Sequence, residues 1–386
     1  MSVTAYPDLY ELPQELRDLR AMVRRLAQER IAPRAAQIDR DAAYPQDVRE
    51  LLAEHDVLGL QFAAEHGGTG TGTLMLNVAI EEIAAACASS ALILMLQELG
   101  TLPIKLFGSE EQKQRVLPRC ASGEWLAAFA LSEAEAGSDP AAMRTTARRD
   151  GDEWVIDGAK AWITNAGIAD FYVVFASTDR EARRTTAFLV ERDRPGLSIG
   201  KLEHKLGIKG SPTGSPVLEG VRVPDENVIG GVGGGLRVAL GTLEISRLGA
   251  AAQAVGIAQG ATDYANAYAK ERLTFGVPLN RHQGIQFKLA EMETRTAAAR
   301  ELLYKACALA DRDPHPADLG RWTSMAKLFA ADTAMAVTVE AVQVLGGYGY
   351  TTEYPVERML RDAKITQIYE GTSEIQRIVI ARAMAS

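Results

Sequence analysis

The sequence predicts a multidomain α+β protein in which a β region separates two helical regions. Apolar residues recur at three- and four-residue steps before residue 122, which is the spacing of amphipathic helices. Short runs rich in Val, Ile, Thr and aromatic residues, divided by turn signals, fill residues 125–231. Long Ala-rich segments follow after residue 235. We therefore expect an N-terminal all-α domain, a central β domain and a C-terminal helical domain, at residues 1–122, 123–232 and 233–386.

The N-terminal region is expected to be helical from residue 12 to about residue 122, with a loop at residues 65–72. This loop has G-x-G spacing, but no strand precedes it and no Lys-Ser pair follows it. A phosphate-binding loop is therefore not predicted, and His66 is interpreted as an ordinary loop residue.

The central region carries two predicted hairpin turns, at Asp150-Gly151 and at Asp157-Gly158. Glycine supplies the positive φ that tight hairpin turns need. Further strands are expected at residues 171–176, 185–190, 197–202 and 216–223. These short strands predict a compact barrel or sandwich.

The C-terminal region predicts long helices at residues 236–272, 282–311 and 318–345. The glycine-rich segment 230–235 is interpreted as a flexible entry into the first of them. Long helices with short links favour packing as a four-helix bundle.

Composition excludes several classes of function. The 386 residues carry a net charge of −8, which argues against general binding to nucleic acid or to an anionic membrane. Three widely spaced cysteines suggest neither a disulfide framework nor a metal site, so we predict no metal and a reducing compartment. We also expect no secretory signal and no stretch apolar enough to span a bilayer, and hence a cytoplasmic protein.

The stretch around Glu370 is the strongest candidate for chemistry. Ser373 and Gln376 have the spacing of a capping box, which places Glu370 on a bend just before a helix. Gly371 allows a ligand to come close to the backbone there. This is a suitable place for a base that removes a proton from carbon. The alternative is an ordinary acidic residue near a helix start, stabilised by the helix dipole.

Residues 361–376, including Tyr369-Glu370-Gly371-Thr372, resemble the C-terminal signature of the acyl-CoA dehydrogenase family of flavoproteins. The resemblance extends over roughly residues 12–384. It implies the acyl-CoA dehydrogenase fold, a bound FAD, and Glu370 as the catalytic base. It also implies that Gly371 contacts substrate.

Two motifs of the β region resemble the flavin-binding signatures of this family, at residues 129–139 and 160–167. Without the resemblance, the first is a strand that ends in an acidic turn, and the second holds a tryptophan that would usually be core. Many members have Pro where this chain has Ala134. The resemblance implies that the flavin ring is contacted by Phe129, Leu131, Ser132, Trp162 and Thr164, and that Ser138 reaches flavin or substrate.

Leu243-Glu244-Ile245-Ser246-Arg247 resembles the family's segment along the acyl-CoA cleft. Glu244 and Arg247 share a helix face, so a surface ion pair is the alternative interpretation. Many members have Asp where this chain has Glu244. Some members carry their base at the position of Ser246, so here Glu370 is the sole matching base.

The remaining cofactor contacts are implied at the end of the helical domain and beside the base. An arginine fork suits a pyrophosphate, and paired glycines allow close approach to a phosphate. The resemblance assigns these contacts to Arg272, Thr274, Phe275, Leu279, His282, Gln283, Gln343, Val344, Leu345, Gly346, Gly347, Thr372 and Glu374. Residues 272–287 and 343–347 would contact the FAD of a neighbouring subunit, which predicts a homotetramer built as a dimer of dimers.

The resemblance implies α,β-dehydrogenation of a short- to medium-chain acyl-CoA, straight or branched, to the trans-2-enoyl thioester. Glu370 would take the α-proton, the flavin would accept the β-hydride, and an electron-transferring flavoprotein would receive the electrons. Three alternatives stay open: an oxidase that passes electrons to oxygen, a dehydrogenase acting on a carrier-protein thioester, and a catalytically silent helical binding protein.

Overall fold

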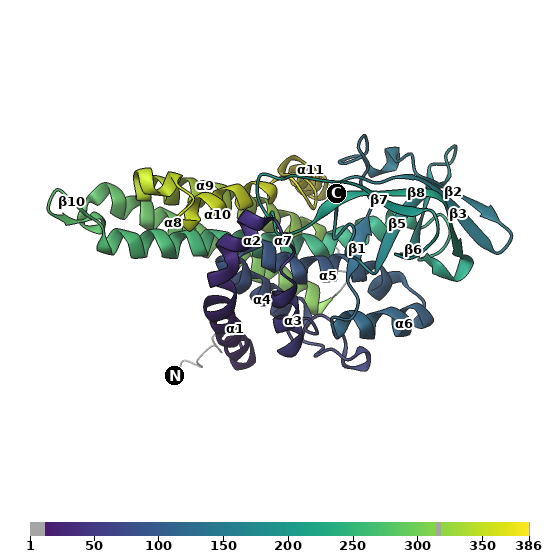
Figure 1. The fold of residues 1–386 in the computed structure, drawn as a ribbon, viewed down its shortest axis with the longest axis horizontal. Coiled ribbons are helices and arrows are strands. Elements are labelled where there is room, and N and C mark those ends of the chain that lie inside the picture. The colour runs from purple at the N-terminus through teal and green to yellow at the C-terminus, as the bar shows by residue number, and fades with distance from the viewer. Residues whose placement is uncertain (1–11, 314–317, 386) are drawn as a thin grey trace.

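The computed structural model describes residues 12–313 and 318–385. The start of the predicted N-terminal domain and the last residue of the predicted C-terminal domain lie outside these ranges. Helices, strands and helices follow one another in the predicted order. Figure 1 shows the long C-terminal helices on the left and the strands on the right, with the N-terminal helices below them. The three-part fold is confirmed, whereas the boundaries at 122/123 and 232/233 stay predictions.

The N-terminal helical region packs around α5, whose residues 88–104 are all buried. Glycine is needed where α5 passes the sheet, because a Cβ at Gly100 would lie 2.4 Å from the Cβ of Ala127. The helices of this region are α1 (Gln14–Leu26), α2 (Ala35–Asp41), α3 (Gln46–Glu54), α4 (Gly72–Ala86), α5 (Ala88–Phe107) and α6 (Glu110–Ala121).

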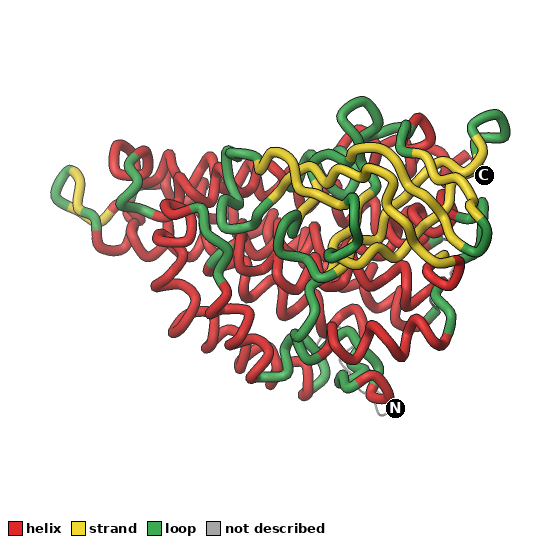
Figure 2. Tube along the Cα trace, turned by 45° about the vertical axis from the view of Figure 1, so that its right-hand side comes forward, coloured by secondary structure: helices red, strands yellow, loops and turns green. Residues whose placement is uncertain are grey.

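The β region is one hydrogen-bonded sheet in the order β4-β8-β3-β2-β5-β6-β9, with β1 paired to β5 and β7 to β8. Figure 2 shows these strands gathered over one side of the helices. The strands are β1 (Ala127–Ala130), β2 (Thr146–Asp150), β3 (Glu153–Ala159), β4 (Ile163–Thr164), β5 (Phe171–Asp179), β6 (Arg184–Glu191), β7 (Leu197–Leu202), β8 (Thr213–Pro224) and β9 (Val228–Ile229).

Both faces of β5 are buried, which explains its continuous apolar sequence. Phe171, Val173 and Phe175 join the core shared with the helices. Tyr172 and Val174 point the other way, into the core of the β region itself. The two-residue period of a strand therefore connects both cores through one element.

One of the two predicted hairpins is confirmed and the other is wrong. Gly151, with φ of 69°, lies in the tight turn that joins β2 to β3. Gly158 instead lies within β3, where the register with β8 shifts as in a β-bulge. A Cβ at Gly158 would lie 2.7 Å from the Cα of Thr145, so this glycine serves close packing and the strand continues through it.

The three predicted long helices are present as α7 (Gly235–Glu271), α8 (Gln283–Arg312) and α9 (Leu319–Leu345), and the shorter α10 (Pro355–Ile365) and α11 (Ser373–Ala385) follow them. A small hairpin, β10 (Leu273–Thr274) with β11 (Val277–Pro278), lies between α7 and α8. Small residues let α7 approach α4 closely, since a Cβ at Gly256 would lie 2.2 Å from the carbonyl oxygen of Glu81.

The glycine-rich entry to α7 is tied to the sheet, contrary to the interpretation of a flexible link. The backbone N–H of Gly233 donates to Oγ1 of Thr186 at 2.9 Å. A Cβ at Gly235 would lie 2.8 Å from the backbone of the same residue. Glycine is required there because the start of α7 crosses β6 at close range.

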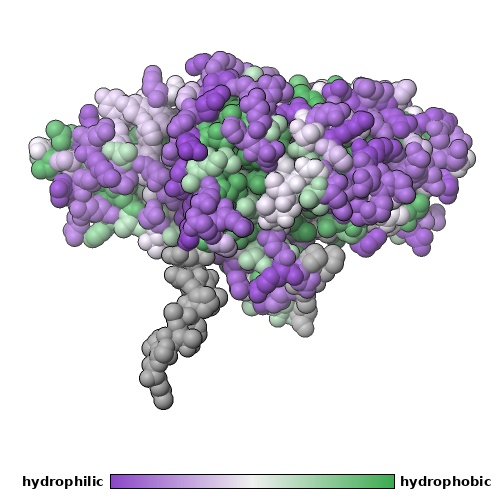
Figure 3. All heavy atoms as spheres, turned by 90° about the horizontal axis from the view of Figure 1, so that it is seen from below, coloured by the Kyte–Doolittle hydropathy of each residue, from purple (hydrophilic) through white to green (hydrophobic). Residues whose placement is uncertain are grey.

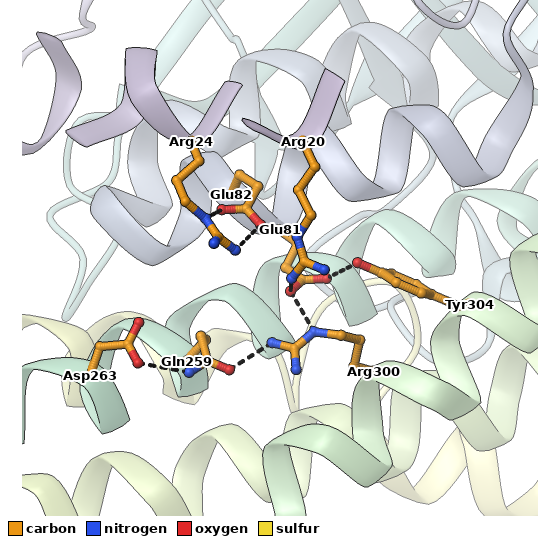
Figure 4. A network of polar contacts seen from close by, with 8 residues as sticks. All are labelled: Arg20, Arg24, Glu81, Glu82, Gln259, Asp263, Arg300 and Tyr304. Atoms are coloured by element: carbon orange, nitrogen blue, oxygen red, sulfur yellow. Dashed lines mark hydrogen bonds and ion pairs between the residues drawn. The ribbon is translucent and has the colours of Figure 1, made fainter. Parts of the chain in front are cut away.

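A buried polar network joins α1 to α4 and α8 (Figure 4). Arg20 and Arg24 pair with Glu82 at 2.6 and 2.8 Å, and Arg300 pairs with Glu81 at 2.7 Å. Burial alone would raise the pKa of Glu82, but the hydrogen bonds from Arg24 and Arg20 outweigh it and lower that pKa. The network therefore stabilises the N-terminal helix on the bundle through charged groups with mutual partners.

Judged by length and composition alone, two helices could span a membrane, so the expectation of no such stretch is wrong. Residues Ala88–Phe107 and Leu319–Tyr350 reach mean hydropathies of 1.3 and 1.5. In the fold, 83% and 50% of these windows are buried, because α5 packs on β1 and α7 while α9 packs on α7 and α8. The face seen in Figure 3 is covered mostly by hydrophilic side chains. The helix α5 is therefore a core helix, whereas α9 buries one half and leaves Phe329 and Val339 exposed.

Candidate active site

Glu370 lies on the bend between α10 and α11, as the sequence predicts. It adopts a positive φ of 54°, and Gly371 follows with φ of 83°. Non-glycine residues rarely adopt this conformation, so the surrounding structure must hold it. The amide of Gln376 does so by donating to the carbonyl oxygens of Glu370 and Gly371 at 3.1 and 2.8 Å.

The predicted Ser373–Gln376 capping box does not form. Oγ1 of Thr372 instead accepts from the backbone N–H of Ile375 at 3.3 Å, which makes Thr372 the residue that caps α11. Thr372 and Ser373 both carry a hydroxyl that could cap the helix. The cap is formed by Thr372, because the side chain of Gln376 already donates to the carbonyl oxygens of the bend. The cap is one residue closer to Glu370 than expected.

The Glu370 carboxylate is held by a hydroxyl and lies near two cations. Oγ of Ser246 donates to its Oε2 at 2.8 Å. Burial raises the pKa of Glu370, while Ser246, Arg247 and Lys327 act in the opposite direction and limit the rise. The residue as a whole is only half-buried. It therefore combines access for a ligand with the weak solvation that makes a carboxylate more basic.

Lys327 is a member of the site that sequence reasoning missed. It is fully buried on α9, and its Nζ donates to the carbonyl oxygen of Gly371 at 2.6 Å. Burial lowers its pKa to about 8 although Glu370 favours its charged form. The available signal was a lysine among the small and apolar residues of α9, at a position that the helical period places in the core.

Arg247 is also buried, and the alternative interpretation, a surface ion pair with Glu244, is not observed. Its Nε donates to the carbonyl oxygen of Leu243 at 2.8 Å, and its Nη1 donates to Oγ of Ser324 at 2.5 Å. Glu244 lies instead against the start of α9, where a Cβ at Gly320 would be 2.6 Å from its Oε1. The two residues share a helix face, yet Arg247 is buried and interacts electrostatically with Glu370.

The flavin motifs of the β region surround an uncovered tryptophan. Trp162 is 62% exposed and adopts a φ of 62°. A large flat apolar ring left open and held in a strained conformation is suited to stacking against a planar cofactor. Thr164 on β4 is half-buried nearby, whereas Ser138 lies exposed in the preceding loop.

The first flavin motif is supported from beneath by a buried ion pair. Phe129 and Leu131 are themselves buried, so they can offer a ligand mainly backbone atoms. Nζ of Lys160 donates to the carbonyl oxygen of Leu131 at 3.2 Å and to Glu133 at 2.8 Å. Ser132, between them, remains half-buried. The ion pair thus connects the two motifs and fixes the loop in between.

The second set of predicted cofactor residues forms the tip of the helical bundle. Thr274 and His282 contact each other across β10 and β11, with Phe275 fully exposed at the turn. The guanidinium of Arg272 lies over the ring of Tyr348, which brings residues 343–347 to the same tip. An open arginine and glycines at residues 346 and 347 fit the pyrophosphate side of FAD.

The two cofactor sets lie far apart along the long axis of the chain. Figure 1 shows β10 at the left-hand end, while β1 lies in the strand region on the right. The tip residues therefore do not lie beside the flavin motifs of the same chain. The structure brings Glu370, Gly371, Ser246 and Arg247 together, but it does not bring the tip residues to them.

Backbone strain marks the same segments. Of the eight non-glycine residues with positive φ in the described chain, four lie in predicted site segments: Trp162, Asn165, Phe275 and Glu370. Strained residues persist where surrounding contacts over-determine them, and they cluster at functional sites.

A groove of about 420 Å³ between α8 and α9, lined by Met292, Met335 and others, contains none of the predicted site residues.

Comparison with known proteins agrees with this architecture. Three family descriptions match in order: acyl-CoA dehydrogenase N-terminal domain at residues 13–124, middle domain at 128–221 and C-terminal domain at 233–385. The probable acyl-CoA dehydrogenase FadE25 of Mycobacterium tuberculosis is 47% identical over 98% of this chain and 97% of its own length.

Solved structures are equally similar. Butyryl-CoA dehydrogenase from Megasphaera elsdenii superposes with a TM-score of 0.94 at 40% identity, covering 98% of this chain and all of that one. The prolyl acyl carrier protein oxidase AnaB gives 0.93 at 30% identity, covering 97% and 100% of the two chains. The chain therefore belongs to the acyl-CoA dehydrogenase family and is an FAD-dependent oxidoreductase of that type.

Proposed function

We propose that the protein removes two hydrogens from a short- to medium-chain acyl-CoA, straight or branched, to give the trans-2-enoyl thioester. The observation that carries the proposal is the Glu370 carboxylate, which is accessible to a ligand yet surrounded by protein and held by Ser246. A carbon acid needs a base of raised basicity whose position is fixed before the substrate arrives.

Glu370 takes the α-proton, and its own backbone can stabilise the charge that develops. Among the described residues, no acceptor is found for the N–H of Glu370. An unpaired N–H beside the base is a suitable donor for the thioester carbonyl oxygen, which becomes an enolate as the proton leaves. Gln376 and Lys327 hold the neighbouring carbonyl groups, so this N–H is presented on a fixed backbone.

FAD, when bound, supplies the acceptor for the hydride that leaves the β-carbon. Trp162 would cover its ring and shield the reaction from water, while the backbone of residues 129–132 and Thr164 would hold its polar edge. Thr372 and Glu374, which directly follow the base, are proposed to contact the dinucleotide side. Ser138, Glu244, Arg247 and Gly371 are proposed to contact substrate.

We further propose that each FAD is held by two subunits of a homotetramer. The separation of β1 from β10 in one chain supports this, because the tip residues need a cofactor that belongs to another copy. The assembly would be a cytoplasmic dimer of dimers, and an electron-transferring flavoprotein would receive the electrons. Three buried free cysteines suit a reducing compartment.

The test is anaerobic bleaching of the bound flavin by acyl-CoAs graded in length and branching. Glu370→Gln keeps the shape and the flavin but lacks the base, so turnover should fall by about 10²–10⁴-fold. Bleaching by butyryl-CoA in the parent enzyme and its loss in the variant would support the proposal. Equal rates in both proteins would remove Glu370 from the role.

An acyl-carrier-protein oxidase is the second candidate, favoured by the similarity to AnaB over 97% of this chain. The two candidates differ in the form of the thioester and in the electron acceptor. Peroxide release in air, measured against reduction of an acceptor dye, separates an oxidase from a dehydrogenase. Parallel assays with CoA and carrier-protein thioesters separate the two carriers.

A further inference from the structure

The ammonium group of Lys327 is buried without a carboxylate partner. Lys327 lies in the first half of α9 and has no exposed surface. Among the residues that the structure describes, its Nζ forms no ion pair, and it donates instead to the carbonyl oxygen of Gly371 at 2.6 Å. Burying a charge without a paired opposite charge is costly. The stability of the bundle therefore does not explain a lysine at this position.

The charged groups around Lys327 come from four elements. Glu370 on the bend, Asp332 on α9 and Glu374 on α11 favour its charged form, whereas Arg247 on α7 opposes it. Burial has the largest effect and lowers the pKa of Lys327 to about 8. Asp332 is only partly buried and Glu374 is exposed. Of the three carboxylates, Glu370 has the largest electrostatic effect on the lysine.

The same interaction acts on Glu370 in return. Burial raises the pKa of Glu370, and three groups act against that rise, which are, in decreasing order of effect, Ser246, Arg247 and Lys327. Glu98 on α5 and Tyr369 on the bend also interact electrostatically with Glu370. Burial raises the pKa of both, to about 7 for Glu98. The positive charge of Lys327 thus favours the form of Glu370 that can accept a proton.

The bend is held from α9 as well as from α11. The carbonyl oxygen of Gly371 accepts from the amide of Gln376 at 2.8 Å in addition to Lys327. The charged donor makes the stronger of these two hydrogen bonds. One turn before Lys327 on the same face of α9, Oγ of Ser324 accepts from Nη1 of Arg247 at 2.5 Å. This face of α9 therefore contacts both the bend and the second cation near Glu370.

We propose that Lys327 is a positioning residue for the proton transfer: its buried positive charge keeps Glu370 ionised, and its hydrogen bond fixes the bend that carries Glu370. The inference rests on the proposed function. The charge acts on the protonation of Glu370, so its removal should slow the reaction mainly at acidic pH. The hydrogen bond acts on the backbone, so its removal should slow the reaction at every pH.

The experiment measures anaerobic reduction of the bound flavin by butyryl-CoA, in a single turnover of the intact flavoenzyme, across acidic and alkaline pH. Lys327→Met removes the charge and the donor, whereas Lys327→Gln removes the charge and keeps a shorter N–H donor. Both variants should lose about tenfold in rate at acidic pH, where the parent lysine is charged. Lys327→Met should also lose about threefold or more at alkaline pH, because the bend is less well held.

Thermal unfolding separates this role from a structural one. Replacing a buried charge with an apolar side chain of similar length should leave the melting temperature unchanged or raise it. A lysine that served only the stability of the bundle would instead give a less stable Lys327→Met variant with the parent pH profile.

Lys305→Met is the matched control, because it removes the same charge from an exposed position on α8. Nζ of Lys305 lies 6.0 Å from the centroid of the Trp322 ring, away from the bend. This variant should keep the parent pH profile. Where only Lys327→Met fails to fold, Lys327→Gln decides.

Three results overturn the role of Lys327. They are an unchanged acidic limb in both Lys327 variants, an equal loss at every pH in both, and loss of the fold or of the flavin in both. Failure of every acyl-CoA to bleach the parent flavin overturns the proposed function instead.

Discussion

Replacing Ser246 with Ala should change the pH dependence of the reaction and leave its alkaline rate intact. Ser246 is 4% exposed, and its hydroxyl donates to the Glu370 carboxylate at 2.8 Å. A hydrogen bond to a charged group contributes about 1.5–3 kcal/mol. Since about 1.4 kcal/mol is a factor of ten, the ionised fraction of Glu370 should fall about 10- to 100-fold at acidic pH.

The sign follows from the form of Glu370 that the hydroxyl stabilises. Ser246 binds the carboxylate and holds the pKa of Glu370 down, against the larger effect of burial. Its removal raises that pKa further, so the carboxylate is lost at a higher pH than in the parent enzyme. The value of kcat/KM should therefore drop on the acidic side, and it should match the parent where Glu370 is fully ionised.

The assay is kcat/KM for butyryl-CoA with an acceptor dye, measured across acidic and alkaline pH at constant ionic strength. Ser246→Thr keeps the hydroxyl and should keep the parent profile. The flavin spectrum reports whether the site is intact in each variant. An unchanged acidic limb in Ser246→Ala, or an equal loss at every pH, would refute the reasoning about Ser246.

Three further changes test other parts of the argument. Glu82→Gln should lower the free energy of unfolding by about 2 kcal/mol at neutral pH. Because the pKa of Glu82 is lowered in the folded state, this difference should shrink as the pH falls through that pKa. Urea denaturation that shows the same difference at every pH would contradict the ion-pair account. Gly371→Ala places a Cβ 2.8 Å from Nε2 of Gln376 at a φ of 83°. It should therefore lower the free energy of unfolding by about 1–3 kcal/mol, and it should reduce turnover more than flavin content. A fully active variant would exclude a rigid bend. Trp162→Ala should weaken FAD retention about tenfold on dilution while Trp162→Phe retains it, and equal retention in both would argue against stacking on this ring.

Local sequence patterns were sufficient for the order of elements. The long helices α7, α8 and α9 follow from Ala-rich segments with few breaks, and the β2–β3 turn follows from Asp150-Gly151. Each of these depends on interactions between residues close in the chain. The second Asp-Gly pair was misleading because Gly158 is determined by its close packing against Thr145, the residue just before β2, which is distant in sequence.

The bend at Glu370 was also predictable, but its supports were not. A helix stop, a glycine and a cap residue are local signals, and they place a carboxylate between α10 and α11. Lys327 and Gln376 reach this bend from other helical positions, and nothing in their own neighbourhoods indicates a shared target. The alternative of a surface pair between Glu244 and Arg247 is not observed, because helix periodicity cannot tell which neighbour a long side chain contacts.

The chain's local chemistry thus fixed three regions, a bend that carries a carboxylate, and the segments proposed to hold a flavin. Packing decided the rest: that Ser246 meets Glu370, that Lys327 reaches the carbonyl oxygen of Gly371, and that β10 lies at the end of the molecule away from the strand region. Helix and strand formation depend on residues a few positions apart, whereas these contacts join residues as distant as 246 and 370. Their energies arise from burial and charge, and both exist only after the helices have packed.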